Sequence, residues 1–291
     1  MSLAWDEPLH ATASIVRNWV LVEQPGAWGP DAVGQSGLSS SAAATLLARG
    51  RQHGFRVLLL RRSLRPADGS RHCFVAHSGR GSRWIEQRVV SDLDELLGVD
   101  FSPLRHGRPV GFGEIRDSAL HLVCTNGRHD PCCANLGRPV ARALQGRPGD
   151  SVWECSHFGG DRFAGNLVCL PHGLYFGRLG PMEARAVVEG YERGVVDLDH
   201  YRGRAGEPFV VQAAEFFVRR DEAVLGVDDL AVAGWRSLAD GVVEVGFAGP
   251  EGRKFEVRVA ARPAPDARPL SCQAAATERP PTYSLLELNL V

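Results

Sequence analysis

Short runs of apolar residues, separated by turn residues, mark the first two thirds of the chain. In the N-terminal part these runs predict strands at 19–23, 55–60, 73–76 and 84–89. A stretch rich in alanine, leucine and arginine predicts a helix over 41–52, and a short helix is expected over 92–97. Glycines between the last two strands favour a hairpin. This part is therefore expected to be an α/β unit.

The next part of the chain shows the same alternation more clearly. Its apolar runs predict strands at 120–124, 152–155, 167–170 and 174–178. Helices are predicted over 133–144, after the first of these strands, and over 182–191, after the last. Strand, helix, strand, hairpin, helix is the order of a thioredoxin-like α/β unit, and the N-terminal part has a looser version of it. We therefore predict an α/β protein with two thioredoxin-like halves.

The remaining residues are expected to form an appended α+β portion. A helix is predicted over 211–219, and strands are predicted at 242–247, 255–260 and 282–288. Prolines and glycines accumulate at 102–113, which favours a domain boundary there. The predicted domains are an N-terminal α/β domain, a thioredoxin-like domain and a C-terminal α+β extension, at 1–115, 116–204 and 205–291.

The balance of charged residues and the distribution of apolar residues indicate which kinds of partner the protein is not expected to bind. Thirty-three basic and 34 acidic residues give a formal net charge of -1, so the chain lacks the positive excess that binding to a phosphate backbone requires. No basic segment followed by an apolar run opens the chain, and no apolar stretch reaches the roughly 18 residues that a membrane helix needs. We expect a soluble, cytoplasmic protein that binds neither nucleic acid nor membrane.

The chain has seven cysteines, an odd number. In a reducing compartment such a number does not favour a disulfide framework. Cys73 and Cys169 lie inside apolar runs, and we interpret them as small buried hydrophobes. The cysteines that lie together around polar loops need another explanation.

The densest group of potential ligands follows two predicted strands. Cys124 and Cys133 flank a polar loop after one strand, and Cys155, His157 and Asp161 lie at the end of another. The crevice outside the carboxyl ends of the strands is the usual ligand site of an open α/β sheet, so the two loops are expected to meet. Thiolates together with imidazoles favour zinc, copper or iron–sulfur centres over hard cations.

Two other interpretations of these residues stay open. Structural zinc sites more often contain close pairs such as Cys-x2-Cys, whereas eight residues separate Cys124 from Cys133, which weakens zinc without excluding it. If no metal binds, Cys124 and Cys155 are buried strand ends and His157 is a hydrogen-bonded loop residue.

Four segments of the chain resemble the sucrase/ferredoxin-like family, namely 19–29, 124–137, 153–166 and 170–177. The resemblance implies a thioredoxin-like ferredoxin domain with a 2Fe-2S cluster. In that family two cysteines of the first loop and two histidines spaced His-x3-His bind the cluster. The matching positions here are Cys124, Cys133, His157 and Asp161. Aspartate therefore stands where the family has its second histidine, and the fourth ligand is open.

Several residues compete for the open ligand positions. Cys155 is as good a fourth ligand as Asp161, because residues i and i+2 of an extended strand point to the same face, so Cys155 and His157 can approach one iron together. Cys132 could replace Cys133, and Cys272 could reach the site from the C-terminal portion. Two glycines, at 159 and 160, would let the backbone pass close to a cluster, or would simply form a turn.

The function predicted from these residues is electron transfer between an unidentified donor protein and an unidentified acceptor protein. A thiol-disulfide oxidoreductase is the first alternative, although the adjacent Cys132 and Cys133 lack the Cys-x2-Cys spacing of that chemistry. A zinc-binding scaffold protein is the second. An electron carrier is favoured over a stand-alone enzyme. A glycosidase is not expected, because no pair of carboxylates stands out from the ordinary surface acids.

Overall fold

The computed structural model describes residues 2–62, 69–271 and 273–291. The helices are α1 (Ser40–His53), α2 (Asp94–Leu97), α3 (Pro131–Leu144), α4 (Pro181–Glu192) and α5 (Phe209–Asp221). Ten strands form one large mixed sheet: β1 (Asn18–Glu23), β2 (Phe55–Arg61), β3 (Arg71–Ser78), β4 (Arg83–Val90), β5 (Glu114–Ile115), β6 (Leu120–Cys124), β7 (Val152–Cys155), β8 (Leu167–Leu170), β9 (Leu174–Phe176) and β10 (Tyr201–Arg204). Four more form a separate antiparallel sheet: β11 (Ala231–Ser237), β12 (Val242–Ala248), β13 (Lys254–Pro263) and β14 (Pro281–Leu290).

The large sheet contains the same arrangement twice. Its strand order is β10-β9-β8-β6-β7-β2-β1-β3-β4-β5. In each half the first two strands are parallel, and the other three follow as antiparallel neighbours beyond the first strand. The halves meet through the antiparallel pair β2 and β7, in which Leu60 lies opposite Cys155. One half is therefore related to the other by an approximate two-fold rotation.

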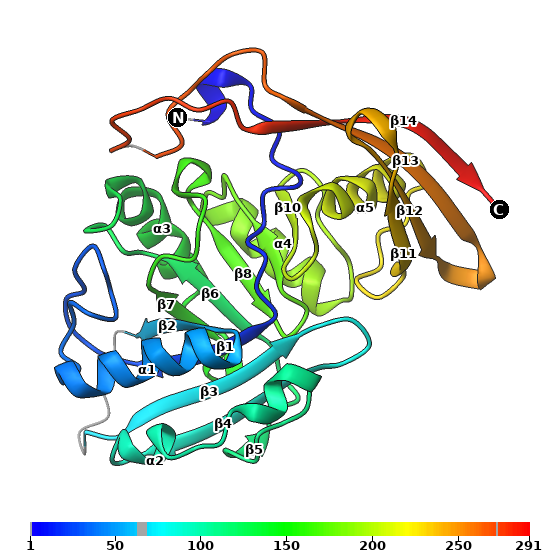
Figure 1. Ribbon diagram of the computed structural model, residues 1–291. Coiled ribbons are helices and arrows are strands. Elements are labelled where there is room, and N and C mark those ends of the chain that lie inside the picture. The colour runs from blue at the N-terminus through cyan, green and yellow to red at the C-terminus, as the bar shows by residue number, and fades with distance from the viewer. Residues whose placement is uncertain (1, 63–68, 272) are drawn as a thin grey trace.

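The sheet is curled, with helices on its outer face (Figure 1). Helices α1 and α2 cover the first half, where Leu46 and Leu96 pack against outward-facing strand residues such as Val22. Helices α3 and α4 cover the second half in the same way. The inner face carries the core that both halves share, including Trp19 from β1 and Trp153 from β7. Each strand contributes side chains to the inner and the outer core, because successive side chains of a strand point to opposite faces of the sheet.

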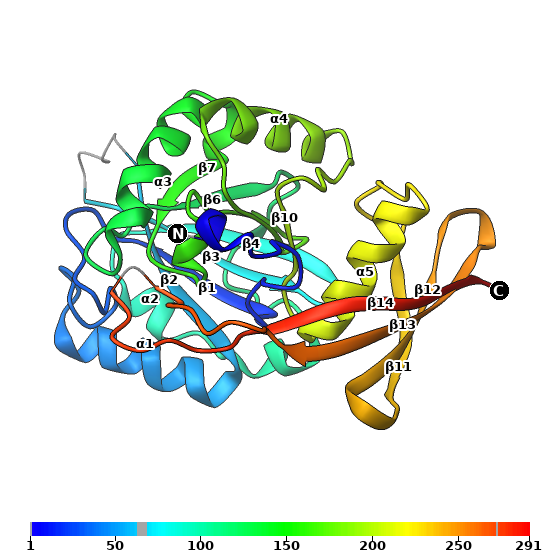
Figure 2. The same ribbon diagram turned by 90° about the horizontal axis from the view of Figure 1, so that it is seen from above.

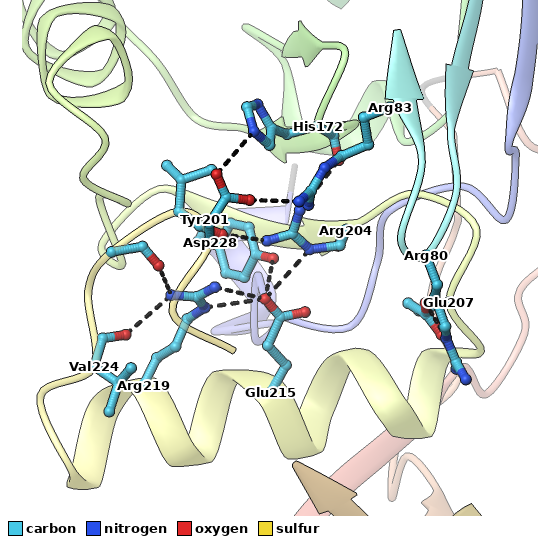
Figure 3. Close-up of polar contacts among 12 residues, drawn as sticks. Arg80, Arg83, His172, Tyr201, Arg204, Glu207, Glu215, Arg219, Val224 and Asp228 are labelled. Carbon is cyan, nitrogen blue, oxygen red and sulfur yellow. Dashed lines mark hydrogen bonds and ion pairs between the residues drawn. The ribbon is translucent and has the colours of Figure 1, made fainter. Parts of the chain in front are cut away.

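The C-terminal sheet lies beside the large one and packs one face against α5 (Figure 2). Buried charges connect α5 to the large sheet (Figure 3). The carboxylate of Glu215 lies 2.9 Å from an Arg219 nitrogen and 3.6 Å from Arg204 Nε, and it accepts a hydrogen bond from Tyr201. Arg83 and Asp228 form an ion pair of 2.6 Å nearby.

The segment between β13 and β14 reaches back to the N-terminal residues (Figures 1 and 2). Its Arg268 lies 3.4 Å from the carboxylate of Glu7, and the backbones of Arg268 and Glu278 exchange two hydrogen bonds. The connection between β13 and β14 is thereby held against the N-terminal residues. No helix among the described residues is both long and apolar enough to cross a membrane.

The α/β class and most predicted elements are confirmed. Strands β6, β7 and β8 have the predicted bounds, and the predicted helices of the second half are extended by two residues or fewer at each end. Cys73 and Cys169 are fully buried, as predicted. The sequence analysis missed β5, β10 and β11. The predicted boundaries after residues 115 and 204 coincide with the ends of β5 and β10, but one sheet runs through both halves, so the division into domains stays a prediction.

Candidate metal centre

Cys124 is the last residue of β6 and lies at the end of the inner sheet face. Its backbone N–H donates to the carbonyl of Asn166 at 3.1 Å, so its position is fixed by the neighbouring strand. Helix α3 passes very close to this strand end, because a Cβ atom at Gly137 would lie 2.0 Å from the Cys124 carbonyl oxygen. Glycine at 137 is therefore required for the approach of α3 to Cys124.

Cys133 lies in the first turn of α3 and is fully buried. Asp130 caps the helix, accepting a hydrogen bond from the Cys132 N–H at 2.8 Å, and Pro131 occupies the first helical position. The N-terminal end of a helix carries a partial positive charge, which stabilises a thiolate. The helix end alone would favour an anionic sulfur at Cys133, but in the metal-free protein the contact with Cys124 outweighs this effect.

His157 follows β7 and is half-buried. The residue before it, Ser156, is locked to β2, since its N–H donates to the Leu59 carbonyl at 2.9 Å and its hydroxyl accepts from the Leu59 N–H at 3.0 Å. This double contact holds the segment in line with the sheet. The imidazole of His157 then projects toward the two cysteines.

The structure brings together three of the predicted ligands. His157 Nδ1 lies 3.8 Å from Cys124 Sγ and 3.7 Å from Cys133 Sγ, and all three ligand atoms lie within 4.8 Å of one another. Among the described residues this is the only group of three or more histidine, cysteine or acidic side chains that meets the criterion. Two thiolates and an imidazole suit zinc and iron–sulfur centres.

The two thiols share a proton in the metal-free protein. The Cys133 thiol donates to Cys124, which holds the pKa of Cys124 well below its usual range despite burial. The same contact, followed by burial, raises the pKa of Cys133. The contact therefore favours the thiolate form at Cys124 and the thiol form at Cys133, and a metal that uses both sulfurs must displace the protons that remain.

Asp161 lies next to this group, at the start of a short 3-10 helix (Asp161–Phe163). It is 7% exposed, and among the described residues its Oδ2 has no hydrogen-bond partner. Burial and then the neighbouring carboxyl of Asp130 raise the pKa of Asp161 to about 6. A buried carboxyl oxygen without a donor is an available ligand atom.

The other predicted ligands lie outside the group of three. Cys155 is fully buried opposite Cys124 in the register of β6 and β7, and burial raises its pKa well above the usual range. Cys132 is half-buried on α3. Because successive helical residues point in directions about 100° apart, only one of Cys132 and Cys133 can face Cys124. Cys272 lies outside the described residues.

Two features of the site escaped the sequence analysis. The imidazole of His129 stacks on that of His157, with ring centroids 3.8 Å apart and planes 17° apart. Arg61 donates to Thr125 and to Glu154, and Thr125 donates to Glu154 at 2.7 Å, which fixes the residue after Cys124. His129 lies in the predicted ligand loop and could have been noticed, whereas the Arg61 contact depends on the pairing of β2 with β7.

Comparison with protein families matches residues 9–203 to the family described as sucrase/ferredoxin-like. The match covers nearly all of the ten-stranded sheet and every residue of the candidate metal centre, and it ends where the C-terminal portion begins. No curated protein and no solved structure gave a significant match.

Proposed function

Because the chain belongs to the sucrase/ferredoxin-like family, we propose that it carries a 2Fe-2S cluster and works as an electron-transfer protein. The observation that carries the proposal is the convergence of Cys124, Cys133 and His157 at the ends of β6 and β7. Such a cluster accepts and releases one electron at a potential set by its ligands, its burial and the hydrogen bonds to sulfur. We further propose that each half of the large sheet is thioredoxin-like.

For the fourth ligand we propose Asp161 over Cys155. Asp161 has a buried oxygen without a donor, and its carboxyl interacts electrostatically with both His157 and Cys133. Cys155 interacts instead with Cys124 and Glu154, and it is not part of the group of three ligands. Asp161→Ala should therefore reduce the amount of cluster bound, Asp161→His should retain the cluster with a higher potential, and Cys155→Ala should retain it unchanged.

Electrons would enter and leave over the imidazoles. Cys124 and Cys133 are 2% and 0% exposed, whereas His157 and the stacked His129 are both partly exposed. The His129 ring is held at the surface by its contact of 3.2 Å with the Pro30 carbonyl. We propose that the donor and acceptor proteins dock over this histidine pair, since it is the accessible edge of the site.

The test is anaerobic reconstitution of the protein with iron and sulfide. The expected result is two irons and two acid-labile sulfides per chain, a visible absorption spectrum, and an electron paramagnetic resonance signal after reduction that shows nitrogen coupling from one histidine. A colourless protein without iron or sulfide after reconstitution would refute the proposal.

One observation favours a second candidate, a mononuclear zinc site. With zinc bonds of about 2.3 Å to sulfur and about 2.0 Å to nitrogen, the edges of a tetrahedron are roughly 3.5–3.8 Å. The sulfur–nitrogen edge is the shorter of these, about 3.5 Å, and the sulfur–nitrogen distances of 3.7 and 3.8 Å lie close to it. Stoichiometric zinc without acid-labile sulfide in the purified protein would establish this alternative.

Thiol-disulfide chemistry is less well supported. Cys124 has the lowered pKa of a reactive thiol, but at 2% exposure it offers no access to a protein disulfide. Its neighbour Cys133 is fully buried. A disulfide reductase assay on metal-free protein should therefore show no activity above background.

A further inference from the structure

Arg202 on β10 is an arginine buried in the core of the molecule, 1% exposed. Its guanidinium donates to the Thr12 hydroxyl and carbonyl at 3.0 and 2.6 Å, to the Gly159 carbonyl at 3.1 Å, and to the Asn166 side-chain oxygen at 2.8 Å. These acceptors are all electrically neutral. They satisfy the hydrogen-bonding capacity of Arg202 but do not balance its charge.

Other buried arginines nearby have a carboxylate partner. Arg204, two residues further along β10, and Arg219 on α5 both pair with Glu215 (Figure 3). Among the described residues, Arg202 forms no ion pair with any carboxylate. A buried cation without a counter-ion is strongly unfavourable, so the fold must provide negative charge close to it.

Two of the groups that stabilise the charged form of Arg202 belong to the candidate metal centre. Cys124 and Asp161 both stabilise the charged form of the guanidinium, although burial is the larger effect and lowers the pKa of Arg202 to about 10. Tyr175 has the largest of these favourable effects, with its ring 5.5 Å from the guanidinium carbon, but burial raises its own pKa to about 12, so near pH 7 it is neutral and offers a ring face rather than a negative charge. Two thiolates and a carboxylate around a bound cluster would strengthen this negative field.

Arg202 also supports both segments that carry the candidate ligands, one by direct contact and the other through Asn166. Its bond to the Gly159 carbonyl holds the turn between His157 and Asp161. A Cβ atom at Gly160, which has a φ of +77°, would lie 2.1 Å from Arg202 Nη2, so the guanidinium lies directly against this turn. Its other contact, Asn166, accepts the backbone hydrogen bond of Cys124.

We propose that Arg202 is a positioning residue that provides the counter-charge of the metal centre and thereby raises its reduction potential. The inference rests on the proposed function, because a potential exists only if the cluster binds. Reduction adds negative charge to the cluster, and a fixed cation nearby stabilises the reduced form. Burial keeps water from screening this interaction.

The experiment compares the reduction potentials of reconstituted wild type, Arg202→Gln, Arg202→Lys and Arg204→Gln, measured by redox titration. Arg202→Gln should lower the potential, whereas Arg202→Lys, which keeps the charge, should stay close to wild type. Arg204→Gln removes a buried arginine of the same strand whose charge Glu215 already balances. It should lower thermal stability and leave the potential unchanged.

A second variant keeps the inference testable if the Arg202→Gln protein fails to bind the cluster. Asn166→Asp puts a carboxylate 2.8 Å from the guanidinium and neutralises Arg202 in place. It should lower the potential as well. A wild-type protein without cluster would refute the proposed function itself. Cluster-loaded variants with the wild-type potential would refute this inference alone. Arg202 would then be one of the positive residues that line the neighbouring cavity of about 380 Å³, together with Arg162 and Arg268.

Discussion

At the scale of single residues, the surroundings of each thiol determine its role. Cys124 and Cys133 share a proton beside an imidazole at the edge of the sheet. Cys73 and Cys169 are equally buried on an outer face of the sheet, and Cys169 has an imidazole beside it, with His121 Nδ1 3.3 Å from its Sγ, but among the described residues neither belongs to a group of three possible ligands. Burial therefore does not distinguish ligand from core cysteines in this protein, whereas the neighbouring side chains do.

We predict that Cys124→Ala and Cys133→Ala each abolish metal binding, and that Cys73→Ala and Cys169→Ala preserve it. The first two changes remove a ligand, whereas the other two remove one core atom at a cost of about 1 kcal/mol. Iron, zinc and sulfide analysis of the four variants after reconstitution provides the measurement. Full metal occupancy in Cys124→Ala would contradict the ligand assignment.

The sequence alone was sufficient to predict the three candidate ligands that converge, but it was not sufficient to predict the residues that support them. Cys124, Cys133 and His157 lie in polar segments directly after apolar strands, a local pattern. Arg202 lies in a short segment with no pattern of its own, and its importance depends on contacts with residues far away in the chain. Such contacts are decided by strand pairing, which periodicity does not specify.

At the scale of elements, the N-terminus of α3 connects helix stability to metal binding. Asp130 caps this helix, and Cys133 follows in its first turn. A comparable cap exists at α1, a helix that carries no candidate ligand, where the Ser39 hydroxyl accepts a hydrogen bond from the Ala42 N–H at 3.2 Å. The two helices therefore offer a matched comparison.

We predict that Asp130→Ala and Ser39→Ala each lower the free energy of unfolding of the metal-free protein by about 1 kcal/mol. Only Asp130→Ala should also weaken metal binding, because it frays the turn that holds Cys133. Urea denaturation and metal titration measure the two effects separately. Asp130→Asn, which can still cap the helix, should restore stability. Equal metal affinities for the two alanine variants would disprove the link.

Elements were predicted from sequence where apolar residues cluster and were missed where they do not. Strand β10 has the sequence Tyr-Arg-Gly-Arg, and β11 is an edge strand of the C-terminal sheet with mostly exposed residues. In both strands backbone pairing with a neighbour, rather than an apolar face, specifies the extended conformation. Propensity and periodicity describe side chains and therefore do not detect such strands.

At the scale of the whole molecule, the charges around Glu215 hold α5 and the C-terminal sheet against the large sheet (Figure 3). We predict that Glu215→Gln lowers the free energy of unfolding by about 3–5 kcal/mol, because it leaves the buried Arg204 and Arg219 without a counter-ion. Glu287→Gln, which breaks a solvent-exposed pair with Arg258, should have a much smaller effect, because water screens that pair. Thermal and urea unfolding would measure both variants, and similar losses would contradict the prediction.

Buried histidines should make the folded protein sensitive to acid. Burial is the main cause that lowers the pKa values of His10, His121 and His172 from 6.5 to about 4. The unfolded chain therefore takes up protons that the folded chain does not, so stability should be full above pH 6.5 and should fall as the pH drops toward 4. The free energy of unfolding, measured across this range, provides the test.

His10→Phe serves as the control for this pH dependence. The imidazole of His10 stacks on Phe216 with centroids 4.2 Å apart, so a phenyl ring can occupy the same place without titrating. This variant should lose less stability than wild type between pH 6.5 and 4. An identical pH dependence would mean that His10 does not contribute.

The meeting of β2 with β7 at the middle of the large sheet is the contact that two copies of one half would make with each other in a symmetric dimer. The protein thus has the form of such a dimer joined into one chain. In a true dimer every mutation occurs in both copies, whereas joined copies can diverge separately. Strand β6 of the second half ends in Cys124. The corresponding strand of the first half, β1, ends instead in Glu23, whose carboxylate lies 3.5 Å from Arg62. Among the described residues the candidate metal centre therefore lies in the second half alone, and the first half supports it through the pairing of β2 with β7.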